Sequence, residues 1–220
     1  MRIALLGAES TGKTTLAAGL ADRLRAQGIA VMLVDEVLRQ WCTRARRAPR
    51  PEEQMAIAQE QERRVDLAAA CADVVIADTT ALMVAIYSGM LFEDGALYRF
   101  ALERQRTYDI ALVTGLDLAW KDDGLQRAGP HVRESVDALV REALRAARVD
   151  FRVIYGSGPE RLANALAAMR SVYPEKAGAA AAEKGSRPKG SWTWSCEKCS
   201  DPDCEHRLFT GLGRRGATGS

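Results

Sequence analysis

Short runs of apolar residues recur along the chain and alternate with longer segments whose apolar residues repeat at helical spacing. The short runs lie at residues 3–6, 29–34, 74–77, 110–114 and 151–155. Each has the length and composition of a strand that is buried on both faces of a parallel sheet. Alternation of such strands with helices is typical of α/β proteins. We therefore expect a five-stranded parallel sheet flanked by helices.

The segments between these runs predict the helices. The first helix carries Leu16, Leu20 and Leu24 on one face and is expected to end near Gly28. Pro51 opens a long helical segment that extends to about residue 71. Further helices are expected at about 80–90, 96–106, 133–148 and 159–171. Ligands of such sheets bind beyond the carboxyl ends of the strands, so the residues that follow each strand are the candidates for a site.

The first apolar run leads directly into a phosphate-binding P-loop at residues 7–14, Gly-Ala-Glu-Ser-Thr-Gly-Lys-Thr. The two glycines let backbone N–H groups surround a polyphosphate, Lys13 places a charge on the β and γ phosphates, and Thr14 offers a hydroxyl to Mg²⁺. A chance match would lack the preceding strand and the following helix. We expect ATP and Mg²⁺ to bind here, through Gly7, Glu9, Ser10, Thr11, Gly12, Lys13, Thr14 and Thr15.

Carboxylates follow the second and third strands. Asp35 and Glu36 are either candidates for the base that orients a phosphoryl acceptor or acids favoured at a helix N-terminus, and the pattern leaves both open. Asp78 ends an apolar run, as a Walker B acid does, and is expected to hold Mg²⁺ together with Thr14. Thr79 and Thr80 are suited to capping the next helix.

The segment after the fourth strand, residues 120–127, combines Trp120, two acids, Gly124 and Arg127. It has the composition of a lid whose Arg127 stabilises charge on the transferring phosphoryl group. The alternative is an ordinary charged connection. After the fifth strand, residues 156–159 predict a tight turn beside the adenine ring, with Arg161 near it.

Composition narrows the classes of function. The 220 residues have a net charge of +2, which is too small to indicate nucleic acid or a membrane as a partner. The start of the chain leaves no room for a signal peptide before the P-loop, so we expect a cytoplasmic protein. Five arginines form either a solvated loop or a patch that meets phosphate or substrate: Arg39, Arg44, Arg46, Arg47 and Arg50. Two cysteines, Cys42 and Cys71, are expected in the core.

The C-terminal part differs in composition from the body at residues 1–173. Residues 174–191 are rich in Ala, Gly, Ser and Lys, which predicts a flexible linker. In residues 192–220, Cys196, Cys199, Cys204 and His206 are spaced closely enough to form a tetrahedral Zn²⁺ site. Such a knuckle binds a partner protein or fastens the tail, and free thiols are the alternative.

The P-loop, the acids after the second strand, Ile-Ala-Asp-Thr-Thr at residues 76–80 and above all residues 108–127 together resemble the ribosylnicotinamide kinase domain of NadR-type proteins. The resemblance covers about residues 1–173. It is most specific in the order of Trp120, Asp123, Gly124 and Arg127. It implies a nucleoside-kinase sheet, ATP and Mg²⁺, and phosphorylation of the 5′-hydroxyl of a ribonucleoside such as nicotinamide riboside.

The family pattern assigns roles at matching positions. Lys13 and Thr14 match the P-loop, and the remaining matches are the acid Glu36, the first acid Asp78 and the lid Arg127. Where the family is expected to have a second acid after the third strand, this chain has Thr80. The resemblance does not imply the adenylyltransferase and DNA-binding roles of NadR. Two functions follow as expectations: a kinase that acts on a nucleoside-like small molecule, or a regulatory ATPase that acts through its tail.

Overall fold

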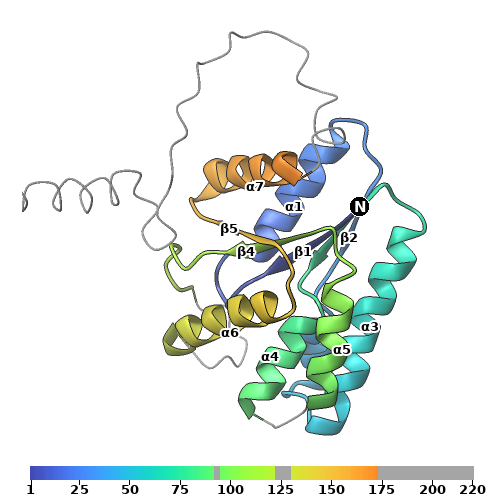
Figure 1. The fold of residues 1–220 in the computed structure, drawn as a ribbon, viewed down its shortest axis with the longest axis vertical. Helices are drawn as coiled ribbons and strands as arrows, with labels where there is room; N and C mark the ends of the chain where they lie inside the picture. The colour runs from blue at the N-terminus through green and yellow to red at the C-terminus, as the bar shows by residue number, and fades with distance from the viewer. Residues whose placement is uncertain (92–94, 122–129, 173–220) are drawn as a thin grey trace, which may run out of the picture. The chain divides into compact units, whose positions relative to one another are not determined.

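A computed structural model describes residues 1–91, 95–121 and 130–172 of the chain. Within them five strands form one parallel sheet in the order β2-β3-β1-β4-β5 (Figure 1). The strands are β1 (Arg2–Leu6), β2 (Val31–Val34), β3 (Val74–Asp78), β4 (Ile110–Thr114) and β5 (Phe151–Ile154). The expected fold class, a five-stranded parallel sheet with flanking helices, is confirmed.

The helices lie between successive strands, except for α7, which follows β5. They are α1 (Lys13–Arg25), α2 (Val37–Ala45), α3 (Pro51–Ala69), α4 (Ala81–Leu91), α5 (Gly95–Gln105), the short 3₁₀ helix η1 (Pro130–Val132), α6 (Arg133–Ala146) and α7 (Gly158–Val172). The first strand, β1, lies between β3 and β4, and its Leu5 is in register with Asp78. The carboxyl ends of these three central strands therefore meet at one edge of the sheet.

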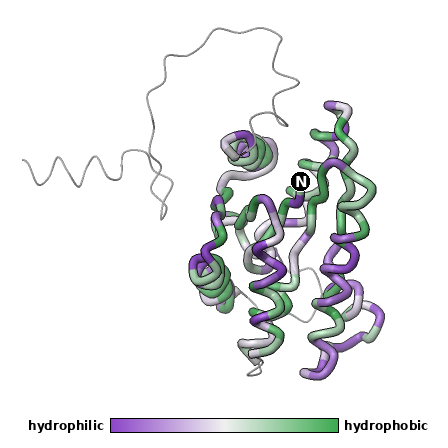
Figure 2. The backbone as a smooth tube through the Cα atoms, turned by 45° about the vertical axis from the view of Figure 1, so that its right-hand side comes forward, coloured by the Kyte–Doolittle hydropathy of each residue, from purple (hydrophilic) through white to green (hydrophobic). Residues whose placement is uncertain are grey.

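The two faces of the sheet are covered by different helices, as Figure 1 shows for α1 and α7 on one side and α3 to α6 on the other. Side chains alternate between the faces along a strand. In β1, Ile3 and Leu5 pack with α1 and α7, whereas Ala4 and Leu6 pack in the cluster that includes α3 to α6. Hydrophobic positions gather in the central strands, while the helices carry both hydrophilic and hydrophobic positions (Figure 2). Both faces of β1 are thus buried, which fixes the position of the loop that follows it.

Helix α2 differs from the sequence prediction, which allowed a solvated loop around the five arginines. The segment Val37–Ala45 is helical and ends where Arg46 adopts a left-handed conformation with φ of 54°. Val37 is buried, and Leu38 and Trp41 pack against the core. These three residues share a helix face. Their spacing indicates a helix, but the neighbouring arginines favoured the interpretation as a loop.

The two cysteines also differ from prediction. Cys71 is exposed just beyond the end of α3, and Cys42 on α2 is only partly buried. Burial, followed by the charge of Glu36, raises the pKa of the Cys42 thiol, which favours its protonated form. No helix in the described part of the chain is both long and apolar enough to cross a bilayer.

Candidate active site at the P-loop

The P-loop is shaped by two glycines in conformations that other residues rarely adopt. Gly7 has φ of 137°, and a Cβ at this position would clash with the Thr114 hydroxyl at the end of β4. Gly12 has φ of 78° and forms the N-cap of α1, where its carbonyl accepts a 2.9 Å hydrogen bond from the Leu16 N–H. The loop therefore packs closely on β4 and leads into a helix whose N-terminus suits an anion.

The side chain of Lys13 lies along the loop itself. It is only 8% exposed, and its Nζ donates hydrogen bonds to the carbonyls of Gly7 at 3.0 Å and Ala8 at 2.7 Å. A flexible side chain with three donors can turn from these carbonyls to phosphate oxygens. The ammonium group is thus held within the loop that is expected to bind the polyphosphate.

Thr14 and Asp78 meet where α1 begins and β3 ends. The Thr14 hydroxyl donates a 2.5 Å hydrogen bond to Oδ2 of Asp78. Asp78 is 2% exposed, and no described residue hydrogen-bonds to its other oxygen, Oδ1. A hydroxyl beside a buried carboxylate with a spare oxygen is the hard oxygen donor set that Mg²⁺ prefers. The two residues predicted to hold Mg²⁺ are therefore adjacent and fit that ion.

The two acids after β2 differ in their exposure and contacts. Asp35 is exposed, whereas Glu36 is the N-cap residue of α2 and its side chain is 15% exposed. Glu36 forms a 2.8 Å ion pair with Arg39, whose other terminal nitrogen donates to the Thr14 hydroxyl at 3.1 Å. Arg39 lines one hollow together with residues 10–15 of the P-loop. Glu36 is therefore connected to the phosphate-binding residues through Arg39.

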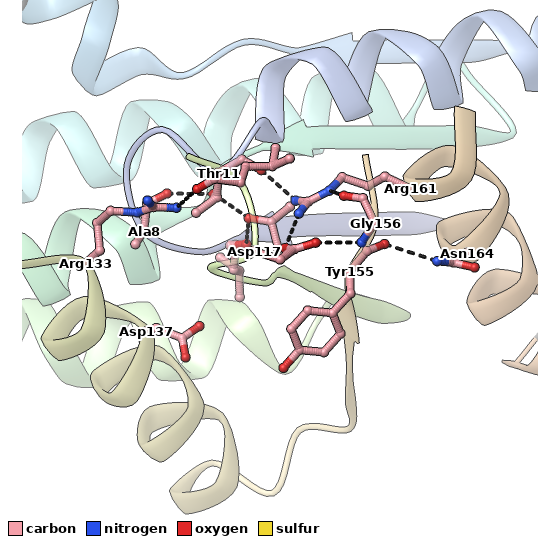
Figure 3. Close-up of polar contacts among 12 residues, drawn as sticks. Ala8, Thr11, Asp117, Arg133, Asp137, Tyr155, Gly156, Arg161 and Asn164 are labelled. Atoms are coloured by element: carbon pink, nitrogen blue, oxygen red, sulfur yellow. Dashed lines mark hydrogen bonds and ion pairs between the residues drawn. The ribbon is translucent and has the colours of Figure 1, made fainter. Parts of the chain in front are cut away.

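An ion pair between a buried arginine and a partly exposed aspartate supports the P-loop (Figure 3). Arg161 of α7 is 3% exposed and pairs with Asp117. It also donates hydrogen bonds to the carbonyls of Thr11 at 2.6 Å and Gly156 at 2.7 Å. Asp117 in turn accepts a 2.6 Å bond from the Gly156 N–H. The pair joins the P-loop to the segments that follow β4 and β5, so Arg161 holds the loop rather than lying free beside it.

The segment after β4 is fastened to the P-loop at Ser10. The Ser10 hydroxyl accepts from the Lys121 N–H at 2.7 Å and donates to the Lys121 carbonyl at 3.1 Å. Arg133, at the start of α6, donates a 2.9 Å bond to the carbonyl of Leu118. Arg127, the expected lid arginine, lies outside the described residues. Lys121, six residues before it in the sequence, contacts the P-loop.

Thr80 is buried and makes its hydrogen bonds within the protein. It is 1% exposed, its hydroxyl donates to Gln105 at 2.8 Å, and it accepts from the Leu82 N–H at 3.2 Å. Glu62 of α3 accepts a 2.9 Å bond from the Ala81 N–H beside it. Burial raises the pKa of the Glu62 carboxyl. These contacts fix the start of α4, as expected of a capping threonine.

Sequence reasoning missed several of these contacts. It named Arg39 only as one of five clustered arginines, and it assigned no role to Thr114 or Asp117. The one signal for Asp117 was its position after β4, next to the segment already singled out. The expected zinc ligands Cys196, Cys199, Cys204 and His206 lie outside the described residues, as do the linker at 174–191 and the tail at 192–220. Within the described residues no cluster of metal-binding side chains was found.

Comparison with solved structures finds a similar fold in proteins of low sequence identity. NadR in complex with NR aligns with a TM-score of 0.60 at 18% identity, over 78% of this chain and 51% of that chain. NadR in complex with NAD and AMP-PNP aligns with a TM-score of 0.59 at 16% identity, over 86% and 51%. Deoxyadenosine kinase from M. mycoides, with the products dCMP and dCDP, aligns with a TM-score of 0.53 at 16% identity, over 78% and 100%.

This chain spans about half the length of the NadR chains. At such identities the likeness concerns the fold alone. No curated protein matches the chain in sequence. A family model described as an AAA domain matches residues 2–161, which include the P-loop, Asp78 and Arg161. The chain therefore belongs to this AAA domain family of P-loop, nucleotide-binding proteins.

Proposed function

We propose that this protein transfers the γ-phosphoryl group of ATP to a hydroxyl of a nucleoside-like small molecule, with nicotinamide riboside as the first candidate. The observation that carries the proposal is the hydrogen bond between Thr14 and Asp78, which joins the P-loop to a buried carboxylate at the end of β3. The folds of NadR in complex with NR and of deoxyadenosine kinase support a nucleoside as the acceptor. The kinase domain corresponds to residues 1–173.

Different residues are assigned different parts of phosphoryl transfer. The backbone N–H groups of the P-loop and the Lys13 ammonium hold the phosphates and offset their charge. Thr14 and Asp78 would hold Mg²⁺, which when bound neutralises charge on the β and γ phosphates. Arg127, in the segment that follows Lys121, is assigned to stabilise the negative charge that develops on the transferring phosphoryl group. Together these groups supply the positioning and electrostatic stabilisation on which phosphoryl transfer depends.

Of the two acids after β2, Glu36 is the better candidate to orient the acceptor hydroxyl. Its carboxylate lies beside Arg39, which contacts Thr14, whereas Asp35 is exposed to solvent. A base must lie within hydrogen-bond reach of the proton that it accepts. Glu36 would meet this requirement for an acceptor bound beside the hollow lined by Arg39 and the P-loop.

A second function, a regulatory ATPase that acts through its tail, is favoured by one observation. Thr80 replaces the second acid expected of the family, and its hydroxyl is engaged within the protein by Gln105 and the Leu82 N–H. Residue 80 therefore supplies no carboxylate to an acceptor. In this alternative, water accepts the phosphoryl group and the nucleotide state changes the tail's affinity for a protein partner.

Mass spectrometry of the products separates the two functions. The full chain is incubated with ATP, Mg²⁺ and single nucleosides, and ADP is quantified beside any nucleoside monophosphate. The kinase proposal expects one monophosphate formed in equal amount to ADP, and nicotinamide riboside is tested first. ADP with inorganic phosphate and no monophosphate would overturn the kinase and favour the ATPase.

A further inference from the structure

We propose that Arg39 contacts the terminal phosphate of the bound nucleotide and lets the site distinguish a triphosphate from a diphosphate. The inference rests on the proposed function in one respect, because it requires ATP to lie in the P-loop. It does not depend on which acceptor receives the phosphoryl group. It assigns a specific role to one member of the arginine cluster.

The helix that carries Arg39 is fixed at its beginning. The Val37 N–H of α2 donates a 2.8 Å hydrogen bond to the buried side chain of Gln61 on α3. One turn later, Gln40 accepts a 2.7 Å bond from Arg64, also on α3. Arg39 lies between these two attachments. Its backbone position beside the P-loop is therefore set by the packing of α2 on α3.

The contacts of Arg39 place its guanidinium at the metal end of the P-loop. One terminal nitrogen donates to the Thr14 hydroxyl at 3.1 Å, and the other pairs with Glu36 at 2.8 Å. The side chain is 33% exposed and lines the hollow formed by residues 10–15. A guanidinium has five N–H donors in a planar fork, so it can keep the pair with Glu36 and still donate to an anion in this hollow.

Electrostatics indicates which anion Arg39 meets. Mg²⁺ held by Thr14 and Asp78 would repel a guanidinium at the Thr14 hydroxyl. The side chain can relieve this repulsion by rotating about its own bonds toward negative charge. The oxygens of the terminal phosphate lie next to that metal position in a P-loop, and the fork of an arginine matches two such oxygens. ADP lacks this phosphate, so the contact would be specific to the triphosphate.

The other arginines of the cluster differ from Arg39 in their surroundings. Arg47 is held by Glu53 at 2.7 and 2.6 Å and lies over the ring of Trp41 at 4.7 Å. Arg44 is on the same helix as Arg39 but is exposed. In the described structure Arg39 is the member of the cluster that lines the P-loop hollow. Arg44 is therefore a matched control, since its loss removes the same charge from the same helix.

Calorimetric titration of the full chain tests this role without catalysis. The affinities of AMP-PNP, a non-hydrolysable triphosphate, and of ADP are measured with Mg²⁺ for the unmodified protein, Arg39→Ala, Arg39→Gln and Arg44→Ala. We expect the unmodified protein and Arg44→Ala to prefer the triphosphate by about tenfold or more, the range for a hydrogen bond between charged groups. In both Arg39 variants the preference should fall to within about threefold, with ADP affinity nearly unchanged.

Two results would overturn the proposal. One is an unchanged preference for the triphosphate in Arg39→Gln, which keeps most of the side chain's length and packing. The other is an equal loss of affinity for both nucleotides, which would make Arg39 a general support of the loop. A failure to phosphorylate any nucleoside would leave these affinities unaffected, so the failure of the proposed function and the failure of this inference are distinguishable.

Discussion

We propose that three residues carry the central chemistry: Lys13 and Thr14 at the start of α1 and Asp78 at the end of β3. Burial of β1 on both faces fixes where Lys13 begins α1. Parallel pairing places Leu5 opposite Asp78, so the carboxylate lies next to the loop. The hydrogen bond from Thr14 then joins the two elements. The contact between the Thr14 hydroxyl and the buried Asp78 carboxylate thus follows from the order of the strands.

Replacing Asp78 by Asn tests its role in holding Mg²⁺. We expect the variant to lose about 100-fold or more in turnover, the scale seen when one electrostatic stabiliser is removed. We also expect Mg²⁺ to no longer tighten ATP binding, because a neutral amide is a weaker ligand of a hard cation than a carboxylate. Calorimetric titration of ATP with and without Mg²⁺ measures the second effect.

The matched control for Asp78→Asn is Asp22→Asn on the solvent-exposed side of α1. It should retain both turnover and the effect of Mg²⁺ on ATP affinity. Mg²⁺ that still tightened ATP binding to Asp78→Asn would exclude Asp78 as a ligand of the metal.

Individual residues differ in how well sequence predicted them. Lys13, Thr14 and Asp78 could be named as candidates because a P-loop and an apolar run ending in an acid are local patterns. The choice between Asp35 and Glu36 was left open, since it depends on which side chain α2 turns toward the loop. Asp117 and Arg161 are 44 residues apart and pair only once the sheet has formed. Contacts of this kind have no local signal in a single sequence.

At the scale of elements, the P-loop is supported by α7 as well as by its own strand. Arg161 connects α7 to the Thr11 carbonyl and to Asp117. Replacing Arg161 by Met removes these charged hydrogen bonds from a buried position. We expect the free energy of unfolding to fall by about 2–3 kcal/mol, measured by urea denaturation.

Two further variants give the Arg161 prediction its control. Arg170→Met alters an exposed arginine on the same helix and should change the free energy of unfolding by less than about 0.5 kcal/mol. Combining Arg161→Met with Asp117→Asn should cost less than the sum of the two single changes, because the groups interact directly. Strict additivity would argue against the pair as a support of the loop.

The start of α3 predicts a dependence of stability on pH. A hydrogen bond from Arg47, followed by one from the Arg50 N–H, lowers the pKa of Glu53 to about 2. A carboxyl with a depressed pKa in the folded state stabilises the protein above its ordinary pKa of 4.5, and this contribution is lost as the pH falls toward 2. The destabilisation caused by Glu53→Gln should therefore be largest near neutral pH and shrink on acidification.

Urea denaturation at a series of pH values between about 7 and 3 tests the Glu53 prediction. Glu52→Gln removes the same charge from the same exposed helical turn and serves as the control. An equal pH-dependent effect in both variants would attribute the change to overall charge rather than to the contacts of Glu53.

Elements were predicted better than their ends. All five strands and six of the helices were expected, because buried runs and helical periodicity are strong signals. The expected strand at 29–34 is shorter, Val31–Val34, because the Ile29 N–H still donates to the Leu24 carbonyl at the end of α1. Helix α2 was not predicted, because its arginines suggested a loop, although its apolar face packs on the core. Packing against the core therefore stabilises a helix that the charged residues alone did not predict.

At the scale of the whole molecule, the function of the tail is a question separate from that of the AAA domain at residues 2–161. We propose that Cys196, Cys199, Cys204 and His206 bind zinc, because their types and spacing suit a closed tetrahedral site. Metal analysis of the purified full chain should find about one zinc ion per chain. Changing Cys196 and Cys199 to Ser should remove it, and a zinc-free unmodified protein would contradict the proposal.

The most direct measurement is ADP production from ATP and Mg²⁺ across a panel of nucleosides that includes nicotinamide riboside. It compares the unmodified protein with Lys13→Ala and with Arg23→Ala, an exposed change on the same helix. We predict that one nucleoside stimulates turnover, that Lys13→Ala abolishes it and that Arg23→Ala retains it. Turnover indifferent to every nucleoside, or a Lys13→Ala variant with normal activity, would contradict the account.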